Sequence, residues 1–138
     1  MDKQYYPVEI EEKWSKIWSE RVISNKDSDT SFSQVIPPPN VTGTLHMGHS
    51  FQYAIMDFYT RYHHMTGKDA HWQVGADHAG IATQMVVENN LAKKDMTRLE
   101  LGREKFLNEV WSWKDYSEEK ITSQIKRLGC SVDWNKYR

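Results

Sequence analysis

The sequence predicts an α/β fold built on parallel strands, preceded by an N-terminal helix and followed by further helices. Strand, loop and helix patterns occur twice in that order between residues 32 and 94. A helical pattern joins the two strand patterns, and strands connected in this way usually pair in parallel through a right-handed crossover. Each strand pattern ends in a polar loop that contains Gly or Pro, so both strands have a clear stop.

The N-terminal part predicts a helix, a linker and the first strand. A helix is expected over 5–23, because apolar residues recur at helical spacing and Pro7 suits a first turn. Its expected apolar face comprises Ile10, Trp14, Ile17 and Trp18. The polar residues 24–31 predict a linker. The residues FSQVI (32–36) favour a short strand that ends before Pro37.

The middle of the chain predicts a long helix, a second strand and a further helix. The long helix begins near Leu45 and ends at Gly67, a natural helix stop. Its expected apolar face comprises Leu45, Phe51, Ile55, Phe58 and Tyr62. The second strand is expected over 71–75, followed by a loop and a helix over 81–94.

Two more helices are expected in the C-terminal part. Thr97 and Glu100 have the spacing of a capping box, which predicts a helix that runs from there towards Trp113. A final helix is expected from about Ser117 to a stop at Gly129.

Parallel pairing has a direct consequence for the two loops. The carboxyl ends of parallel strands lie at one edge of a sheet, so PPPNVTG (37–43) and GADHAG (75–80) should emerge side by side. Each loop leads into the N-terminus of a helix. Because ligands of open α/β sheets bind at this edge, the topology predicts a binding site there.

The first loop and the helix after it have the chemistry of a phosphate site. His46 and His49 are three residues apart and share a helix face, and Gly48 between them would let a flat ring lie close to the backbone. A helix N-terminus attracts phosphate oxygens, and imidazoles can donate hydrogen bonds to charge that develops during nucleotidyl transfer. The alternatives are an ordinary helix start with two surface histidines, and a zinc pair.

The zinc alternative needs further ligands, and the spacing of the available side chains fits no compact zinc pattern. The candidates are His71, Asp77, His78 and Cys130. No metal site is therefore expected.

The second loop carries Asp77 between small residues, directly after a strand. Its carboxylate could bind the ammonium group of a substrate. It could equally cap the helix that begins at Gly80, a common use of Asp. The residues alone do not favour either interpretation.

Composition excludes several classes of protein. The chain of 138 residues holds 18 Lys and Arg and 19 Asp and Glu, a formal net charge of -1, which argues against a free-standing electrostatic nucleic-acid binder. The single cysteine, Cys130, cannot form an internal disulfide and is expected to be a packed side chain. No secretory signal or transmembrane run is visible. A cytoplasmic protein without membrane contact is expected.

Three sequence blocks together resemble one family. His46-Met47-Gly48-His49 has the form H-x-G-H; PPPNVTG precedes it, and WQVGADHAGIATQMVVE (72–88) and residues 102–134 follow it. In this order the blocks resemble the class I aminoacyl-tRNA synthetases, and within them the valine-specific group. The resemblance covers essentially the whole chain. It implies the first half of a Rossmann-type parallel nucleotide-binding fold.

The resemblance also implies an activity and roles for individual residues. It implies a valine–tRNA ligase that converts valine and ATP, with Mg²⁺ bound to the ATP, to valyl-adenylate and then acylates tRNA(Val). His46 and His49 would be catalytic. The implied ATP-binding residues are Thr44, His46, Gly48 and His49, and the implied amino-acid-binding residues are Pro39, Asn40 and Asp77.

The resemblance finally predicts how the chain is organised. Residues 1–31 are expected to be a helical extension and linker, and residues 32–138 the N-terminal part of the class I catalytic domain, truncated before the editing insertion. The family's second signature, a Lys-Met-Ser-Lys-Ser loop, is absent from the sequence. The chain is therefore expected to hold half of the active site of a larger, monomeric enzyme, with tRNA bound mostly elsewhere. A truncated, non-catalytic paralogue that binds nucleotide or tRNA is the alternative.

Overall fold

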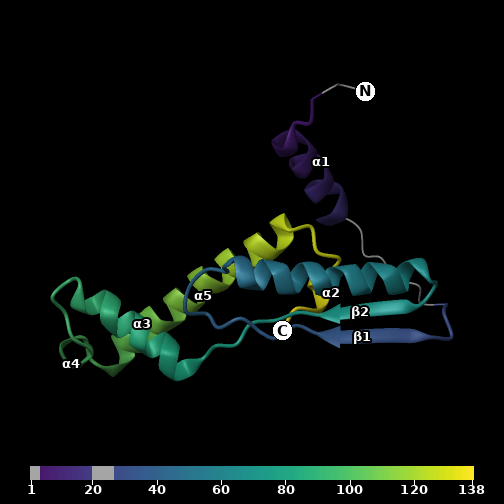
Figure 1. Cartoon of the computed structure of the whole chain (residues 1–138). Helices are drawn as coiled ribbons and strands as arrows, with labels where there is room; N and C mark the ends of the chain where they lie inside the picture. Colours follow the sequence, from purple (N-terminus) through teal and green to yellow (C-terminus); the bar gives the residue numbers. More distant parts are fainter. Residues whose placement is uncertain (1–3, 20–26) are drawn as a thin grey trace. The chain divides into compact units, whose positions relative to one another are not determined.

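The computed structural model describes residues 4–19 and 27–138, which are of α/β class and include a two-stranded parallel sheet (Figure 1). Strand β1 (Ser31–Val35) pairs in parallel with β2 (Asp69–Gln73), in register from Ser31 opposite Asp69 to Val35 opposite Gln73. The predicted parallel pairing is confirmed. Strand β1 begins one residue earlier than predicted, and β2 begins two residues earlier.

The chain divides into two compact units. Unit 1 comprises the described residues up to Pro37, His46–Gly75 and Ser123–Arg138, and unit 2 comprises Pro38–Leu45 and Ala76–Thr122. The helices of the chain are α1 (Pro7–Ser19), α2 (Met47–Met65), α3 (Gly80–Ala92), α4 (Arg98–Leu101), α5 (Arg103–Arg127) and the short 3-10 helix η1 (Trp134–Lys136).

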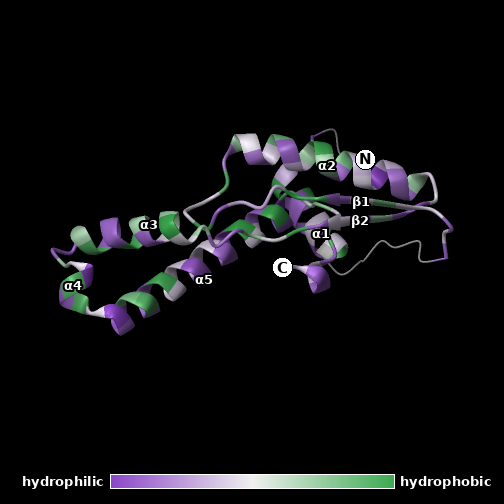
Figure 2. Cartoon of the chain, turned by 90° about the horizontal axis from the view of Figure 1, so that it is seen from below, coloured by the Kyte–Doolittle hydropathy of each residue, from purple (hydrophilic) through white to green (hydrophobic). Residues whose placement is uncertain are grey.

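Helix α2 covers the sheet of unit 1 with a different face from the one predicted. Tyr53 and Thr60 are fully buried against the strands, whereas Phe51 and Phe58 are 70% and 65% exposed. Gln34 of β1 donates hydrogen bonds from Nε2 to the Met56 carbonyl and to Thr60 Oγ1. The predicted apolar face was therefore wrong: the face of α2 that packs on the strands carries Tyr53 and Thr60, and Gln34 pairs with it. Hydrophobic and hydrophilic residues alternate around α2 in Figure 2.

Helix α1 was predicted correctly as a helix, although residues 20–26 of the predicted helix and linker lie outside the described residues. Its expected apolar face is only partly covered, since Trp14 and Trp18 are 43% and 41% exposed. The guanidinium of Arg61 lies 5.0 Å from the Trp18 ring and donates a hydrogen bond to the Gly129 carbonyl. Within unit 1, the Trp18 ring therefore holds the end of α1 against Arg61 of α2.

Gly129 ends the last helix as predicted, and it also makes room for Trp18. Its φ is +71°, and a Cβ built there would lie 2.6 Å from the Trp18 ring. Gly129→Ala is therefore expected to lower the free energy of unfolding by about 1–3 kcal/mol, since alanine is strained at positive φ. Chemical denaturation of the unsubstituted protein and of the Gly129→Ala variant measures this difference in the free energy of unfolding. Gly80→Ala is the control, because its Cβ would meet open space and its φ is not in the left-handed region; equal losses from both changes would contradict the account.

Unit 2 is built around a small apolar core between α3 and α5. Val87, Leu91 and Phe106 are buried in it, and the residues Leu101, Val110 and Trp113 pack against them. The predicted capping box is present, but it opens only the four-residue α4, which ends at Gly102 with φ +79°. Helix α5 then continues without a break past Ser117, where a second helix was expected to begin. The prediction of two helices was wrong because no Gly or Pro interrupts residues 103–127.

None of the helices in residues 4–19 and 27–138 combines the length and the apolar character that crossing a membrane requires.

Candidate functional site

The two predicted loops lie side by side in unit 2. Asn40 and Asp77 form an isolated parallel bridge. The Asp77 N–H donates to the Pro39 carbonyl at 2.9 Å, and the Val41 N–H donates to the Asp77 carbonyl at 3.0 Å. Pro39 is buried, whereas the Asn40 and Asp77 residues are exposed. The backbone therefore holds an amide and a carboxylate together, with both residues open to solvent.

Asp77 shapes its own loop and is not the cap residue of α3. Its Oδ1 accepts the Ala79 N–H at 2.9 Å. The N-cap position is taken by Ala79, which has no side-chain cap bond and has left-handed φ and ψ of 44° and 51°. Such a conformation is unfavourable for alanine and persists only where surrounding contacts impose it. The hydrogen bond of Thr83 Oγ1 to the His78 carbonyl, at 2.6 Å, is one such contact.

Helix α5 holds the first loop through two side chains that the sequence analysis did not identify as part of the site. Trp113 Nε1 donates to the Val41 carbonyl at 3.0 Å, and Ser117 Oγ donates to the Gly43 carbonyl at 2.9 Å. Ser117 is buried, although serine in a helix is usually exposed. The sequence carries no local signal for either contact, because the burial of Ser117 and the partners of both side chains appear only in the fold.

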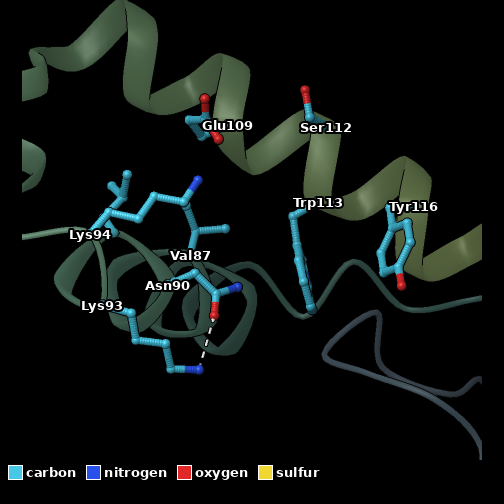
Figure 3. Close-up of a pocket in the computed structure, with 9 residues that line it drawn as sticks. Val87, Asn90, Lys93, Lys94, Glu109, Ser112, Trp113 and Tyr116 are labelled. Atoms are coloured by element: carbon cyan, nitrogen blue, oxygen red, sulfur yellow. Dashed lines mark hydrogen bonds between the residues drawn. The ribbon is translucent and has the colours of Figure 1, made fainter. Parts of the chain in front are cut away.

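A groove of about 460 Å³ lies between α3 and α5 in the same unit. Figure 3 shows Trp113 and Tyr116 projecting from α5 towards this groove. On its α3 side, Lys93 Nζ contacts Asn90 Oδ1 at 3.5 Å. The indole of Trp113 thus has two roles, since it lines the groove and holds the loop.

The two histidines of the H-x-G-H motif cap the N-terminus of α2 in unit 1. His46 is the N-cap residue, and its Nδ1 accepts the Gly48 N–H at 3.1 Å. His49 Nδ1 accepts the His46 N–H at 3.3 Å. The two ring centroids are 4.0 Å apart. Histidine thus fills both positions of a capping box, in which Ser or Thr and Glu or Gln are usual.

This capping sets the tautomer of both rings. A nitrogen that accepts a hydrogen bond carries no proton, so each neutral ring holds its proton on Nε2. His46 is exposed and His49 is partly exposed. The arrangement therefore offers two N–H donors at a helix N-terminus, a place that favours anions.

The His46 ring lies close to Gly48, in the space that a Cβ would occupy. A Cβ at Gly48 would lie 2.9 Å from His46 Cε1 and 3.1 Å from its Nδ1. The predicted approach of a ligand's flat ring to Gly48 stays a prediction; in the structure the His46 imidazole lies beside this glycine.

Burial, and secondarily the neighbouring His46, lower the pKa of His49 below its usual value of about 6.5. His49 is therefore expected to be neutral at pH 7. Because the unfolded state binds this proton first, its contribution to stability is complete above about pH 6.5 and declines as pH falls through the lowered pKa. Burial also lowers the pKa of His64, so both rings should add to the acid sensitivity. NMR titration of the His49 ring measures the effect, and a midpoint at or above the usual value would contradict it.

Cys130 is buried and free, as expected for a packed side chain. Burial raises the pKa of its thiol to about 12, so the thiolate is not available as a nucleophile at neutral pH. Within residues 4–19 and 27–138, no group of three or more His, Cys, Asp or Glu side chains is arranged to hold a metal ion.

The fold and these motifs place the chain in a known family. The model of the tRNA synthetases of class I (I, L, M and V) matches residues 9–138, and the chain belongs to this family. The predicted fold class, the first half of a Rossmann-type parallel fold with helices before and after it, is confirmed.

Curated relatives narrow the similarity to valine–tRNA ligases. The chain is 56% identical over 135 residues to the valine–tRNA ligase of Acinetobacter baylyi, which covers 97% of this chain and 14% of that protein. It is 53% identical over 139 residues to that of Neisseria meningitidis, covering 99% and 15%. It is 50% identical over 141 residues to that of Francisella tularensis, covering 100% and 15%. The chain thus spans only a small part of the length of these relatives.

A solved structure has a similar fold. The LeuRS of Agrobacterium radiobacter K84, crystallised as a ternary complex with tRNA and LeuAMS, matches 98% of this chain and 16% of its own. The TM-score is 0.75 and the identity is 20%. This likeness concerns the fold.

Proposed function

We propose that this chain is the N-terminal part of a valine–tRNA ligase, which activates valine with ATP and transfers it to tRNA(Val). The observation that carries the proposal is the identity of 50–56% to three valine–tRNA ligases over 97–100% of the chain. In the first step a valine carboxylate oxygen attacks the α-phosphorus of ATP. The bond to the leaving pyrophosphate breaks, and valyl-adenylate forms.

In this proposal Asp77 binds the ammonium group of valine, and Asn40 borders the amino-acid pocket. The Asp77 carboxylate is held by one oxygen to the Ala79 N–H, and the residue is exposed. A fixed carboxylate favours a substrate ammonium group. Pro39 forms a rigid wall of the pocket in this proposal. Its carbonyl accepts a hydrogen bond from the Asp77 N–H.

His46 and His49 act on the phosphates of ATP. Their Nε2–H groups donate hydrogen bonds to phosphate oxygens, on which negative charge grows as pyrophosphate leaves. Thr44, two residues before His46, adds a hydroxyl, and Gly48, which has no Cβ, is proposed to let the adenine ring approach the helix. Positioning and electrostatic stabilisation are enough for this step, which needs no covalent nucleophile.

Mg²⁺ is proposed to arrive bound to the ATP phosphates, since the described residues offer no carboxylate cluster for it. When bound, it would neutralise phosphate charge. We further propose that residues 1–31 are an extension of the catalytic domain, which begins at residue 32, and that the enzyme works in the cytoplasm as a monomer.

A graft tests the proposal against the alternative of a non-catalytic paralogue. Residues 1–138 would replace the matching segment of the Acinetobacter baylyi valine–tRNA ligase, giving the protein called here the grafted ligase. It should catalyse ATP–pyrophosphate exchange that depends on valine. Retained tRNA binding and a cooperative thermal transition would show that the graft is folded; a folded graft without valine-dependent exchange would favour the paralogue.

A further inference from the structure

We propose that Trp113 and Ser117 of α5 are positioning residues that set the backbone of the substrate-binding loop. This inference rests on the proposed function, because it concerns how the loop serves valine and ATP. It goes beyond that function in assigning separate roles to two side chains outside the family's signature motif. Trp113 serves the valine end of the loop, and Ser117 serves the ATP end.

The loop from Asn40 to Gly43 is held by hydrogen bonds at both of its ends. At one end, the Asn40–Asp77 bridge holds the loop by its backbone. Beyond that bridge, the carbonyl groups of Val41 and Gly43 accept hydrogen bonds from Trp113 and Ser117. Val41 is fully buried, so its carbonyl would lose a partner without replacement by water if the indole N–H were removed.

The two donor side chains are held rigidly on helix α5. Trp113 and Ser117 are four residues apart on one continuous helix and therefore lie on the same face. Trp113 also packs against the core of Val87, Leu91 and Phe106. Ser117 is 1% exposed. Donors fixed in this way hold the loop more accurately than mobile surface groups would.

The carbonyl groups of Val41 and Gly43 lie at different ends of the loop. Val41 is held on both sides, because its N–H donates to the Asp77 carbonyl and its carbonyl accepts from Trp113. The indole thus stabilises the pairing of the loop with Asp77. The Gly43 carbonyl belongs to the peptide that leads into Thr44, so Ser117 sets the backbone before the proposed ATP-binding hydroxyl.

The test compares Trp113→Phe and Ser117→Ala in the grafted ligase. Each removes a hydrogen-bond donor, and alanine is favourable in a helix, so Ser117→Ala should fold. Trp113→Phe should raise the KM for valine about tenfold with a smaller change in the KM for ATP, and Ser117→Ala should do the reverse. Thr122→Ala is the matched control, because Thr122 Oγ1 donates only to the carbonyls of Glu118 and Glu119 in its own helix.

Hydrogen–deuterium exchange in the same proteins gives a readout that needs no activity. The amides of Val41 and Asp77 should exchange faster in Trp113→Phe, and those of residues 42–45 should do so in Ser117→Ala, with no change in Thr122→Ala. Unchanged exchange in both variants would overturn the proposal, as would a fall in kcat with both KM values unaltered. If the unsubstituted grafted ligase has no exchange activity, the proposed function fails, while the amide exchange still decides whether these side chains position the loop.

Discussion

His46→Ala in the grafted ligase is expected to lower the rate of valyl-adenylate formation by about a hundredfold to a thousandfold, with little change in valine affinity. The Nε2–H of His46 is expected to bind a phosphate oxygen more strongly in the transition state than in the ground state. Its loss should therefore slow the chemical step and leave the ammonium site of Asp77 intact. Pre-steady-state measurement of pyrophosphate release, with valine affinity from the same titration, separates the two effects.

His46→Asn separates this catalytic role from the capping of α2. Asparagine is a good N-cap residue, so its oxygen should replace Nδ1 as acceptor of the Gly48 N–H and preserve thermal stability. It cannot present a donor at the position of Nε2, so the rate should still fall. His71→Ala is the control for loss of a histidine, because His71 lies in β2 and contacts Gln73. A His46→Asn enzyme with the full rate would show that the ring acts only as a cap.

Asp77→Asn is expected to raise the KM for valine about a hundredfold, because a charge-assisted hydrogen bond to the ammonium group is lost. The substitution is nearly isosteric, and the asparagine Oδ1 can still accept the Ala79 N–H that Asp77 accepts now. The loop should therefore keep its shape, and kcat at saturating valine should fall much less than kcat/KM. Valine-dependent ATP–pyrophosphate exchange at varied valine concentration measures both constants.

Asp115→Asn provides the matched control for removal of one negative charge. Asp115 lies on α5 in the same unit, is largely exposed, and pairs with Lys114 at 3.4 Å. Such a surface pair contributes little, and its loss should not alter the KM for valine. An Asp77→Asn enzyme with the same valine affinity as the Asp115→Asn enzyme would show that Asp77 shapes the loop without binding substrate.

The fold was predictable where local signals agree. Pro37 and the strand pattern before it predicted the end of β1 to within one residue, and the helix between the two strands predicted their parallel pairing. From that pairing alone, the loops of Asn40 and Asp77 had to be neighbours, and the structure pairs them residue to residue. The packing face of α2 was not predictable from apolar spacing, because the buried face carries Tyr53 and Thr60 while the more apolar Phe51 and Phe58 are exposed.

The residue types of the candidate site were predictable from the sequence. The side chains that hold its loop by hydrogen bonds were not. H-x-G-H spacing predicted two histidines at a helix start. The hydrogen bonds that their Nδ1 atoms accept, which set the tautomers, depend on ring orientation and were not predictable. Trp113 and Ser117 lie 72 and 74 residues from the carbonyl groups that they hold. Their donors are recognisable only after α3 and α5 are packed, since no spacing rule reaches that far along a chain.

The most direct test of the account is the valine-dependent ATP–pyrophosphate exchange of the grafted ligase. Residues 1–138 would supply the histidine pair, Asn40 and Asp77, and the Acinetobacter baylyi ligase would supply the remainder of the protein. We expect exchange that requires valine. His46→Ala should reduce it by lowering the rate of valyl-adenylate formation, and Asp77→Asn should reduce it by raising the KM for valine. A folded, tRNA-binding graft that gives no valine-dependent exchange would contradict it.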